Sequence, residues 1–386
     1  MIDLVRQAFS DYYNGHMDEI VGPSGIERRE FGFLVMNQGG MIRHKSFRNV
    51  EELRQFIGSI VPSGAYYSAA YYERPEAKMD LKGWMGADLI FDIDADHIRS
   101  DCKREHDYWI CLSCNHIDRF PKPERCPNCG SDRVDEKAWV CDRCLEEAKT
   151  EVIKLMDVLM VEFGFSADDL RVYFSGHRGY HLHIHSNTVV AMDQNARKEV
   201  VDYLLGIGIS PRYVLRESGM GWVGWRGRIL EGTKKILSDE VKLKELGLKR
   251  SAIYGLKRKI SSKNVSSNLD ALETERRLFD AIVESEAVHV DPVVTTDVHR
   301  LIRLPNTLHG KTGFLVQEVL LSDIDDYDPL AMPVVLGDRG SEVYVEKAPQ
   351  FRLKDRIFGP YEKERVDLPL YAAVYLLLKG HAKLIS

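Results

Sequence analysis

The sequence predicts an α+β protein with a cysteine-rich insertion and a separate helical lobe. Strand-like alternation of apolar and polar residues occurs before residue 190 and returns from Val288 onward. The stretch between them, residues 190–285, has mainly helical patterns. All seven cysteines lie between Cys102 and Cys144. These observations divide the chain into two strand-bearing parts, a cysteine block and a helical segment.

We therefore expect four regions. Residues 1–96 and 145–190 would form the N-terminal part of a catalytic core, and residues 286–386 its C-terminal part. Residues 97–144 would be a zinc-binding region with an inserted zinc ribbon, and residues 191–285 a helical lobe. With 386 residues, the chain can bury a substantial core. No apolar run approaches the ~18 residues of a membrane span, and the first residues lack a signal-peptide pattern, so we expect an intracellular protein with reduced thiols and no membrane partner.

Before the cysteine block, the pattern predicts a helix over residues 1–20 and a hairpin over residues 29–47 that turns at Gly39-Gly40. A helix over residues 50–60 and an apolar, tyrosine-rich run over residues 65–72 follow. After the block, a long helix capped by Gly164 is predicted. Its apolar stripe at helical spacing consists of Leu145, Ala148, Val152, Leu155, Leu159 and Phe163.

The second half begins with a hairpin, residues 170–175 and 180–185. A glycine- and tryptophan-rich loop is expected at residues 219–227 within the helical lobe. A strand is expected at residues 288–291 and a helix at residues 298–303, with Asp297 at its N-terminus. The tail from about residue 314 should mix short strands with a final apolar helix over residues 368–379.

An acidic strand at residues 88–96 is the strongest chemical signal. Phe91 and Ile93 fall on one face of this strand, and Asp92 and Asp94 share the other, with Cα atoms roughly 6.5–7 Å apart. Two carboxylates held so close raise each other's pKa unless a cation lies between them. Mg²⁺ in phosphoryl-transfer sites is typically held by such carboxylates. The alternative, a strand running into an acidic turn, suits Asp96 but not the interleaved pair.

Two further segments carry groups suited to phosphates. The turn from Ser175 to His181 combines glycines, which allow a close backbone approach, with hydroxyl, imidazole and guanidinium groups. His183 and His185 would face solvent or pack. The segment from Asp291 to Gly313 contributes Arg303, His309 and Lys311 as a cationic set suited to a triphosphate. Asp291 ends the expected strand and competes with Asp297 for the place of third carboxylate; we favour Asp291.

Local charge adds a weaker signal. Residues 234–263 contain ten Lys or Arg and three Asp or Glu, whereas the whole chain has a net charge of −6. This asymmetry indicates either a polyanion partner or a solvated basic helix face.

Taken in order, the acidic strand, the cysteine cluster, the turn at residues 175–181, Asp291 and residues 304–313 resemble the small catalytic subunit of the archaeo-eukaryotic DNA primase over nearly the whole chain. The resemblance implies a primase-type catalytic core and de novo synthesis of short primers during DNA replication. The enzyme would be a DNA-directed RNA polymerase using two Mg²⁺ or Mn²⁺ ions and nucleoside triphosphates on single-stranded DNA. A large primase subunit is the implied partner, at the replication machinery in the cytoplasm or nucleoid.

The resemblance also assigns roles to residues. Asp92, Asp94 and Asp291 match the metal-binding catalytic carboxylates. The nucleotide-binding positions are Ser175, Gly176, His177, Arg178, His181, Arg303 and His309, with Glu30 and Arg43 nearby. Arg303 stands where the eukaryotic pattern has a lysine, and His177 where it has an arginine.

The family carries a zinc knuckle at the cysteine block, and here the block is larger. The simplest partition gives Cys102, His106, Cys141 and Cys144 as the knuckle and Cys111, Cys114, Cys126 and Cys129 as an inserted ribbon. Both sites would be structural. Two other classes stay open: a primase-polymerase acting in repair, and a non-catalytic zinc-ribbon nucleic-acid-binding protein, which would leave the acidic pair unexplained.

Overall fold

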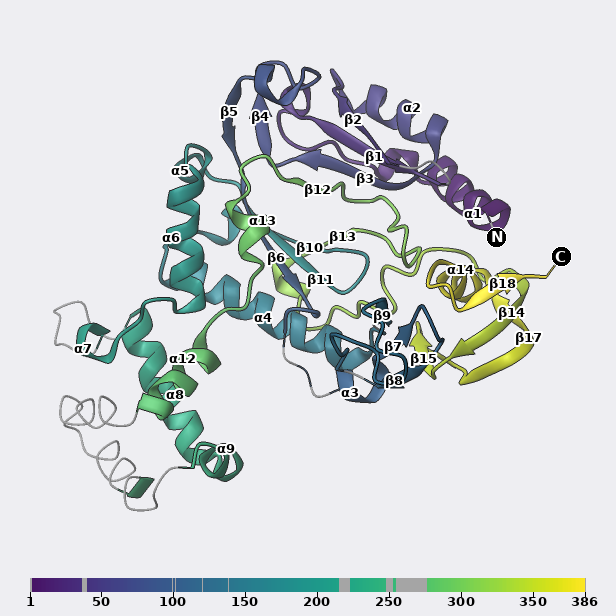
Figure 1. Ribbon diagram of the computed structural model, residues 1–386. Coiled ribbons are helices and arrows are strands. Elements are labelled where there is room, and N and C mark those ends of the chain that lie inside the picture. Colours follow the sequence, from purple (N-terminus) through teal and green to yellow (C-terminus); the bar gives the residue numbers. More distant parts are fainter. Residues whose placement is uncertain are drawn as a thin grey trace.

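The computed structural model describes residues 2–36, 40–98, 100, 102–119, 121–137, 139–214, 223–247, 253–254 and 276–385. Two four-stranded antiparallel sheets lie at its centre, and helices pack around them (Figure 1). The predicted mixture of helices and sheets is confirmed. Among the described residues, no helix is both long enough and apolar enough to cross a membrane.

The first sheet has the strand order β12-β3-β1-β2. Its strands are β1 (Phe31–Val35), β2 (Met41–Lys45), β3 (Pro62–Ser68) and β12 (Leu301–Arg303). The helices α1 (Ile2–Gly15) and α2 (Val50–Ile60) lie beside it, and α2 begins where the Asn49 side chain accepts a hydrogen bond from Glu52 N–H. The predicted hairpin and both helices are present; Gly39 of the expected turn lies outside the described residues.

The second sheet has the strand order β13-β10-β11-β6. Its strands are β6 (Leu89–Asp94), β10 (Leu170–Phe174), β11 (Gly179–Ile184) and β13 (Gln317–Val319). Helix α4 (Asp142–Val161) packs against β6 and β11 and buries the predicted stripe from Leu145 to Leu159. Every residue of β11 is buried, because α4 covers one face of the strand and the first sheet approaches the other, where Tyr67 Oη lies 3.2 Å from His183 Nδ1.

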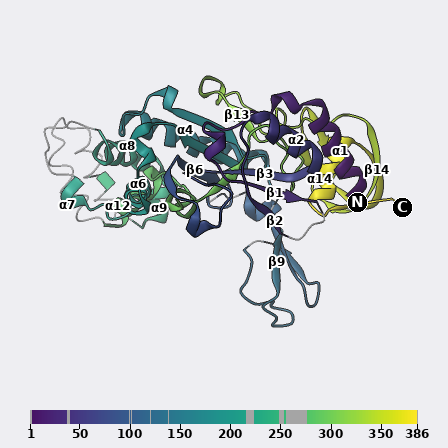
Figure 2. The same ribbon diagram turned by 90° about the horizontal axis from the view of Figure 1, so that it is seen from above.

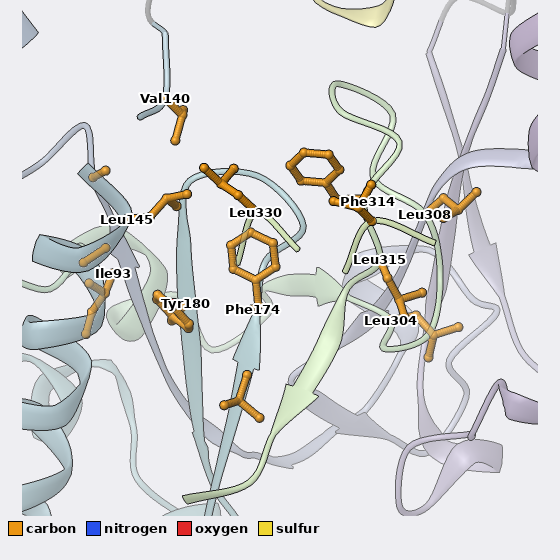
Figure 3. Packing of buried hydrophobic residues seen from close by; sticks show 14 of the residues in the cluster. Ile93, Val140, Leu145, Phe174, Tyr180, Leu304, Leu308, Phe314, Leu315 and Leu330 are labelled. Carbon is orange, nitrogen blue, oxygen red and sulfur yellow. The ribbon is translucent and has the colours of Figure 1, made fainter. Parts of the chain in front are cut away.

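A continuous apolar core joins the two sheets. Residues 304–316 run from β12 of the first sheet to β13 of the second, so the same loop contacts both. Figure 3 shows the labelled core side chains around this junction: Ile93, Val140, Leu145, Phe174, Tyr180, Leu304, Leu308, Phe314, Leu315 and Leu330. This packing joins the second sheet to the connecting loop.

The C-terminal part forms a third sheet of β14 (Gly340–Ala348), β17 (Tyr361–Pro369) and β18 (Ala382–Leu384), with α14 (Leu370–Leu378) packed on it. The hairpin β15 (Phe351–Leu353) and β16 (Arg356–Phe358) lies nearby (Figure 1). The expected apolar helix is therefore present. The expectation of short strands was wrong for β14 and β17, which are nine residues each because they pair along almost their full length.

The cysteine block contains α3 (Lys103–His106) and a small sheet of β7 (Tyr108–Cys111), β8 (Ile117–Arg119) and β9 (Val134–Lys137). Figure 2 shows this sheet projecting from the body of the molecule. It has its own small buried cluster of Trp109, Cys111 and Cys126. The insertion is thus a separate unit attached to the core.

The helical lobe contains α6 (Gln194–Leu205), α8 (Trp225–Ser238), α9 (Glu240–Glu245) and α12 (Arg276–Glu286), with the short α5 (Asn187–Val190) and α7 (Pro211–Val214). The expected loop at residues 219–227 was wrong at its end: Trp225 begins α8 because its ring is buried with Ile229 and Phe279. Residues 215–222, 248–252 and 255–263 lie outside the described residues, and with them six of the ten basic residues of the segment at residues 234–263, including Lys257, Arg258 and Lys259.

The segment before β12 differs from expectation. Residues 288–291 do not form a strand; Val288 N–H donates to Leu204 O, and Asp291 N–H makes a single backbone hydrogen bond to Asp92 O of β6. Asp291 then caps α13 (Pro292–Thr296), and Asp297 ends that helix instead of starting another. The Asp-Pro sequence was the missed signal, since proline is favoured at the first position of a helix.

The remaining elements are short. The strands β4 (Ala70–Tyr72) and β5 (Trp84–Ala87), which follow β3 and precede β6 in the chain, pair antiparallel with each other. Five single turns of 3₁₀ helix complete the description: Met17–Glu19, Ile26–Arg28, Met79–Leu81, Ala167–Asp169 and Leu321–Asp323.

Candidate active site and metal centres

Three carboxylates meet where β6 leaves the second sheet. Asp92 lies opposite His181 in the β6–β11 ladder, and Asp94 lies opposite Gly179. The backbone hydrogen bond from Asp291 N–H to Asp92 O, 2.8 Å long, places the start of α13 directly beside the strand. The structure therefore brings Asp92, Asp94 and Asp291 together, whereas the Asp297 carboxylate accepts a hydrogen bond from His299 N–H.

The three carboxylates repel one another, and the nearby cations offset this repulsion only in part. Burial, followed by the charges of Asp94 and Asp291, raises the pKa of Asp92 to about 7. The charge of Arg300 opposes this shift only in part. A divalent cation would relieve the repulsion. The trio is more widely spread than the thiolate sets described below, whose ligand atoms all lie within 4.8 Å of one another.

The turn between β10 and β11 is held in shape by its own serine and glycines. Ser175 Oγ accepts hydrogen bonds from the N–H groups of His177 and Gly179, each 3.3 Å long. Gly176 has φ +77°, and a Cβ there would lie 2.8 Å from His309 Cβ. A Cβ on Gly179 would lie 1.9 Å from Ile93 O. The turn therefore fits tightly between β6 and the loop at residues 304–316.

Arg178 and His181 each lie beside a carboxylate of the trio and each have one buried nitrogen without a partner among the described residues. The Arg178 guanidinium pairs with Asp96, and its Nε lies 3.7 Å from Asp94 Oδ1. His181 Nε2 lies 3.5 Å from Asp92 Oδ1. Within the described part of the chain, Arg178 Nε and His181 Nδ1 are buried without a hydrogen-bond partner. Because buried polar atoms are normally hydrogen-bonded, these two groups fit a ligand rich in acceptor oxygens.

His177 and His309 stack face to face beside Arg178, with ring centroids 4.9 Å apart and planes 10° apart. Burial, together with the charges of nearby cations, lowers the pKa of both imidazoles well below their usual range. The lowered pKa makes His309 a neutral member of the set of residues that the sequence predicts for phosphate binding. The neutral ring contributes hydrogen bonding, and the charge comes from Arg178, Arg303 and Lys311.

Arg303, at the end of β12, is the residue through which the first sheet contributes a positive charge to the site. Its guanidinium lies 4.9 Å from the centroid of the Tyr66 ring on the neighbouring strand β3. Its charge, after burial, helps to lower the pKa of His181 to about 3 and also lowers that of His309. The strand β12 thus directs a cation toward the carboxylates and imidazoles of the second sheet.

Glu30 and Arg43 occupy a different part of the first sheet. Glu30 is fully buried, and its carboxylate lies 3.0 Å from Arg43 Nε and 3.3 Å from Lys82 Nζ. Burial opposes ionisation, but the hydrogen bond from Arg43 and the charge of Lys82 lower the pKa of Glu30. Burial, followed by the charge of Glu30, raises the pKa of Tyr72. The Tyr72 hydroxyl forms a hydrogen bond 3.0 Å long with His299 Nδ1. The nucleotide role of Glu30 and Arg43 stays a prediction.

Sequence reasoning missed three cations. Arg300 acts on Asp92 and His181, Lys82 pairs with Glu30, and Lys379 at the end of α14 acts on His177 and His309. No local pattern distinguishes these residues from surface lysines and arginines. Only the packing of distant segments places them here.

The eight zinc-ligand candidates fall into the two predicted sets, Cys102, His106, Cys141 and Cys144, and Cys111, Cys114, Cys126 and Cys129. Four sulfur–sulfur distances within these sets, Cys102–Cys144, Cys141–Cys144, Cys111–Cys129 and Cys114–Cys126, are 3.3–3.7 Å. Zn–S bonds of about 2.3 Å in a tetrahedron would give about 3.8 Å. Both sets could therefore hold zinc, with four ligands each.

The first set is built into the core. Cys141 stands at the N-terminus of α4, and Cys102 and Cys144 are buried. His106 Nδ1 lies 2.7 Å from Asp107 Oδ1, which also accepts a hydrogen bond from Trp139 N–H. Such an outer carboxylate orients a ligating histidine. The second set lies in the projecting sheet.

A cluster of carboxylates beside a turn rich in hydrogen-bond donors is typical of metal-dependent enzymes that transfer phosphoryl or nucleotidyl groups. Residues 126–320 match the family described as "DNA primase small subunit". The chain is 32% identical to the DNA primase small subunit PriS of Nitrosopumilus maritimus, over 98% of this chain and 97% of that protein. It is 34% identical to PriS of Archaeoglobus fulgidus, with coverage of 98% and 97%, and 35% identical to PriS of Pyrobaculum arsenaticum, with 93% of each chain covered. The chain belongs to the DNA primase small subunit family.

Proposed function

We propose that this chain is the catalytic subunit of a DNA primase, which synthesises short primers de novo on single-stranded DNA during replication. The observation that supports this most directly is the trio of Asp92, Asp94 and Asp291, whose mutual repulsion raises the pKa of Asp92 to about 7 beside a turn suited to phosphates. Family membership supplies the reaction class.

The carboxylate trio would hold two Mg²⁺ or Mn²⁺ ions. When bound, such ions supply electrostatic stabilisation of the attacking 3′-oxygen and of the leaving pyrophosphate. The fit rests on the chemistry of the donors: three buried or half-buried carboxylates with an excess of negative charge. His181, neutral because its pKa is lowered to about 3, would donate or accept a hydrogen bond next to Asp92 without adding charge.

The triphosphate would lie against the turn and the loop at residues 304–316. Arg178 and Arg303 would donate charge-assisted hydrogen bonds, and His177 and His309 neutral ones. Ser175 and Gly176 shape the turn so that its backbone can approach the ligand. Positioning of this kind aligns the α-phosphate with the attacking hydroxyl.

In the proposed enzyme, the four regions expected from the sequence would have separate roles. A primase-type core would consist of residues 1–96, 145–190 and 286–386, with a zinc-binding region at residues 97–144 and a helical lobe at residues 191–285. Two Zn²⁺ ions would stabilise the insertion. A large primase subunit, single-stranded DNA and nucleoside triphosphates would be its partners, inside the cell at the replication machinery.

The experiment that tests this function supplies purified chain, with no primer, with single-stranded DNA, Mn²⁺ or Mg²⁺, and labelled NTPs or dNTPs in separate reactions. We expect new labelled oligonucleotides that begin with a triphosphate. A parallel reaction with an annealed primer is the control for general polymerase activity. Extension of the primer without any unprimed synthesis would favour the repair primase-polymerase, and no incorporation in either reaction would favour a non-catalytic zinc-ribbon protein.

A further inference from the structure

Lys379 is a cation that no part of the mechanism above uses. It follows the last residue of α14, where its N–H donates to Tyr375 O, and its side chain is half-buried. In the part of the chain that the structure describes, its ammonium makes no ion pair with a carboxylate. A half-buried ammonium without a counter-charge is costly unless an anion arrives.

The charge of the Lys379 ammonium acts on the phosphate cluster. Its charge reaches His177 and His309, whose pKa values it helps to lower after the larger effect of burial. It also lies near Arg178 and Lys311, while the nearby carboxylates Asp96 and Asp107 already have cationic or imidazole partners. Four positive groups, counting Arg303, thus act on one pair of neutral imidazoles.

Two aromatic rings lie next to the Lys379 ammonium. The Lys379 ammonium lies 5.6 Å from the ring centroids of both Trp139 and Tyr375, a distance at which cation–π attraction operates. Trp139 is buried, its ring packs edge-on against Tyr375, and its backbone N–H donates to Asp107 Oδ1. Asp107 in turn contacts His106 of the first thiolate set. Trp139 and Tyr375 thus form a seat for Lys379, and hydrogen bonds connect this seat to the zinc-type centre of the core.

We propose that Lys379 is a nucleotide-binding residue of the primase reaction, and that its ammonium contacts the β- or γ-phosphate of the incoming nucleotide from the seat formed by Trp139 and Tyr375. This rests on the proposed function, because it assumes that the triphosphate lies between the turn at residues 175–179 and the loop at residues 304–316. It adds the C-terminal helix to the site and gives the core zinc-type centre a role in positioning.

The test uses the full chain and the variants Lys379→Met and Lys379→Gln, which keep much of the side-chain length but remove the charge. Lys379→Arg is the conservative variant. Lys383→Met is the matched control, because Lys383 lies four residues away and pairs with Glu346 on the surface. Measured quantities are the affinities for ATP and AMP in the presence of Mg²⁺, KM and kcat for NTPs in primer synthesis, and the affinity for single-stranded DNA.

Loss of one charge-assisted hydrogen bond should weaken ATP binding and raise KM about tenfold or more in both neutral variants. Affinity for AMP, kcat at saturation and affinity for DNA should stay near those of the parent, and Lys379→Arg should recover most of the loss. Unchanged ATP affinity, equal losses for ATP and AMP, or a loss confined to DNA binding would each overturn the proposal. A parent chain that binds no nucleotide would instead contradict the proposed function.

Discussion

Replacing Asp92 with asparagine is expected to reduce primer synthesis by about 10³-fold or more. The ions that the trio would hold contribute several kcal/mol of transition-state stabilisation, and each 1.36 kcal/mol corresponds to about tenfold in rate. The substitution should not unfold the chain. Burial and the charges of Asp94 and Asp291 make the ionised form of Asp92 unfavourable, so an uncharged amide of similar shape removes repulsion.

The choice of Asp291 over Asp297 is tested with matched variants. Asp291 accepts a hydrogen bond from Val293 N–H at the start of α13, so alanine would also remove a helix cap worth about 1 kcal/mol. Asparagine keeps the cap and removes the charge. Asp291→Asn should therefore be inactive with a near-parental unfolding midpoint, and Asp297→Asn should be active. An active Asp291→Asn together with an inactive Asp297→Asn would show that the third ligand is misassigned.

The second large effect is a loss of stability when the first zinc-ligand set, which is built into the core, loses a cysteine. Cys141→Ser should lower the solubility and the free energy of unfolding of the whole chain, because structural zinc sites contribute about 10–16 kcal/mol of apparent binding energy to folding in small zinc domains. Cys141 stands at the N-terminus of α4, whose apolar face packs under β6 and β11. Damage at this position should therefore reach the catalytic strand.

Loss of a cysteine from the second zinc-ligand set, in the projecting sheet, should have a local effect only. Cys126→Ser should unfold only the sheet of β7, β8 and β9 and leave nucleotide chemistry largely intact. Elemental analysis should find two zinc atoms in the parent. Replacement of residues 108–138 by a short linker should leave one zinc atom. A short linker can join the two ends because the backbone N–H of Trp139 lies 2.9 Å from Asp107 Oδ1. Trp139 itself must be kept, because it belongs to the main core. A parent with one zinc, or a deletion that loses both, would contradict the partition.

Local patterns in the sequence predicted the parts of the site that depend on local geometry. Alternation along one strand places Asp92 and Asp94 on a common face, and the CxxC spacing pairs the thiols. The helices α2 and α14 also follow from patterns within single segments. In each case the physical cause lies within a few residues of the motif.

The rest depends on contacts between distant segments. The lowered pKa of His309 results from burial beside Gly176 and from the charges of Arg303 and Lys379, and no spacing in the sequence records these contacts. Lys379 lies 200 residues or more from the turn on which its charge acts. Asp291 is the intermediate case, because its pairing with β6 required the structure, whereas the Asp-Pro capping signal was present in the sequence and was assigned to the wrong residue.

The most direct test of the central claim measures Mn²⁺ affinity of the zinc-loaded chain between pH 5.5 and 8.5. Because the pKa of Asp92 is raised to about 7, the carboxylate holds its proton up to that pH and must lose it to bind a cation. Affinity should therefore rise up to about tenfold per pH unit below pH 7 and level off above it. Asp92→Asn should bind weakly with a flatter pH dependence, and Asp297→Asn should match the parent. Affinity in the parent that does not change with pH, or that Asp92→Asn retains, would contradict the assignment of this trio as the catalytic metal site.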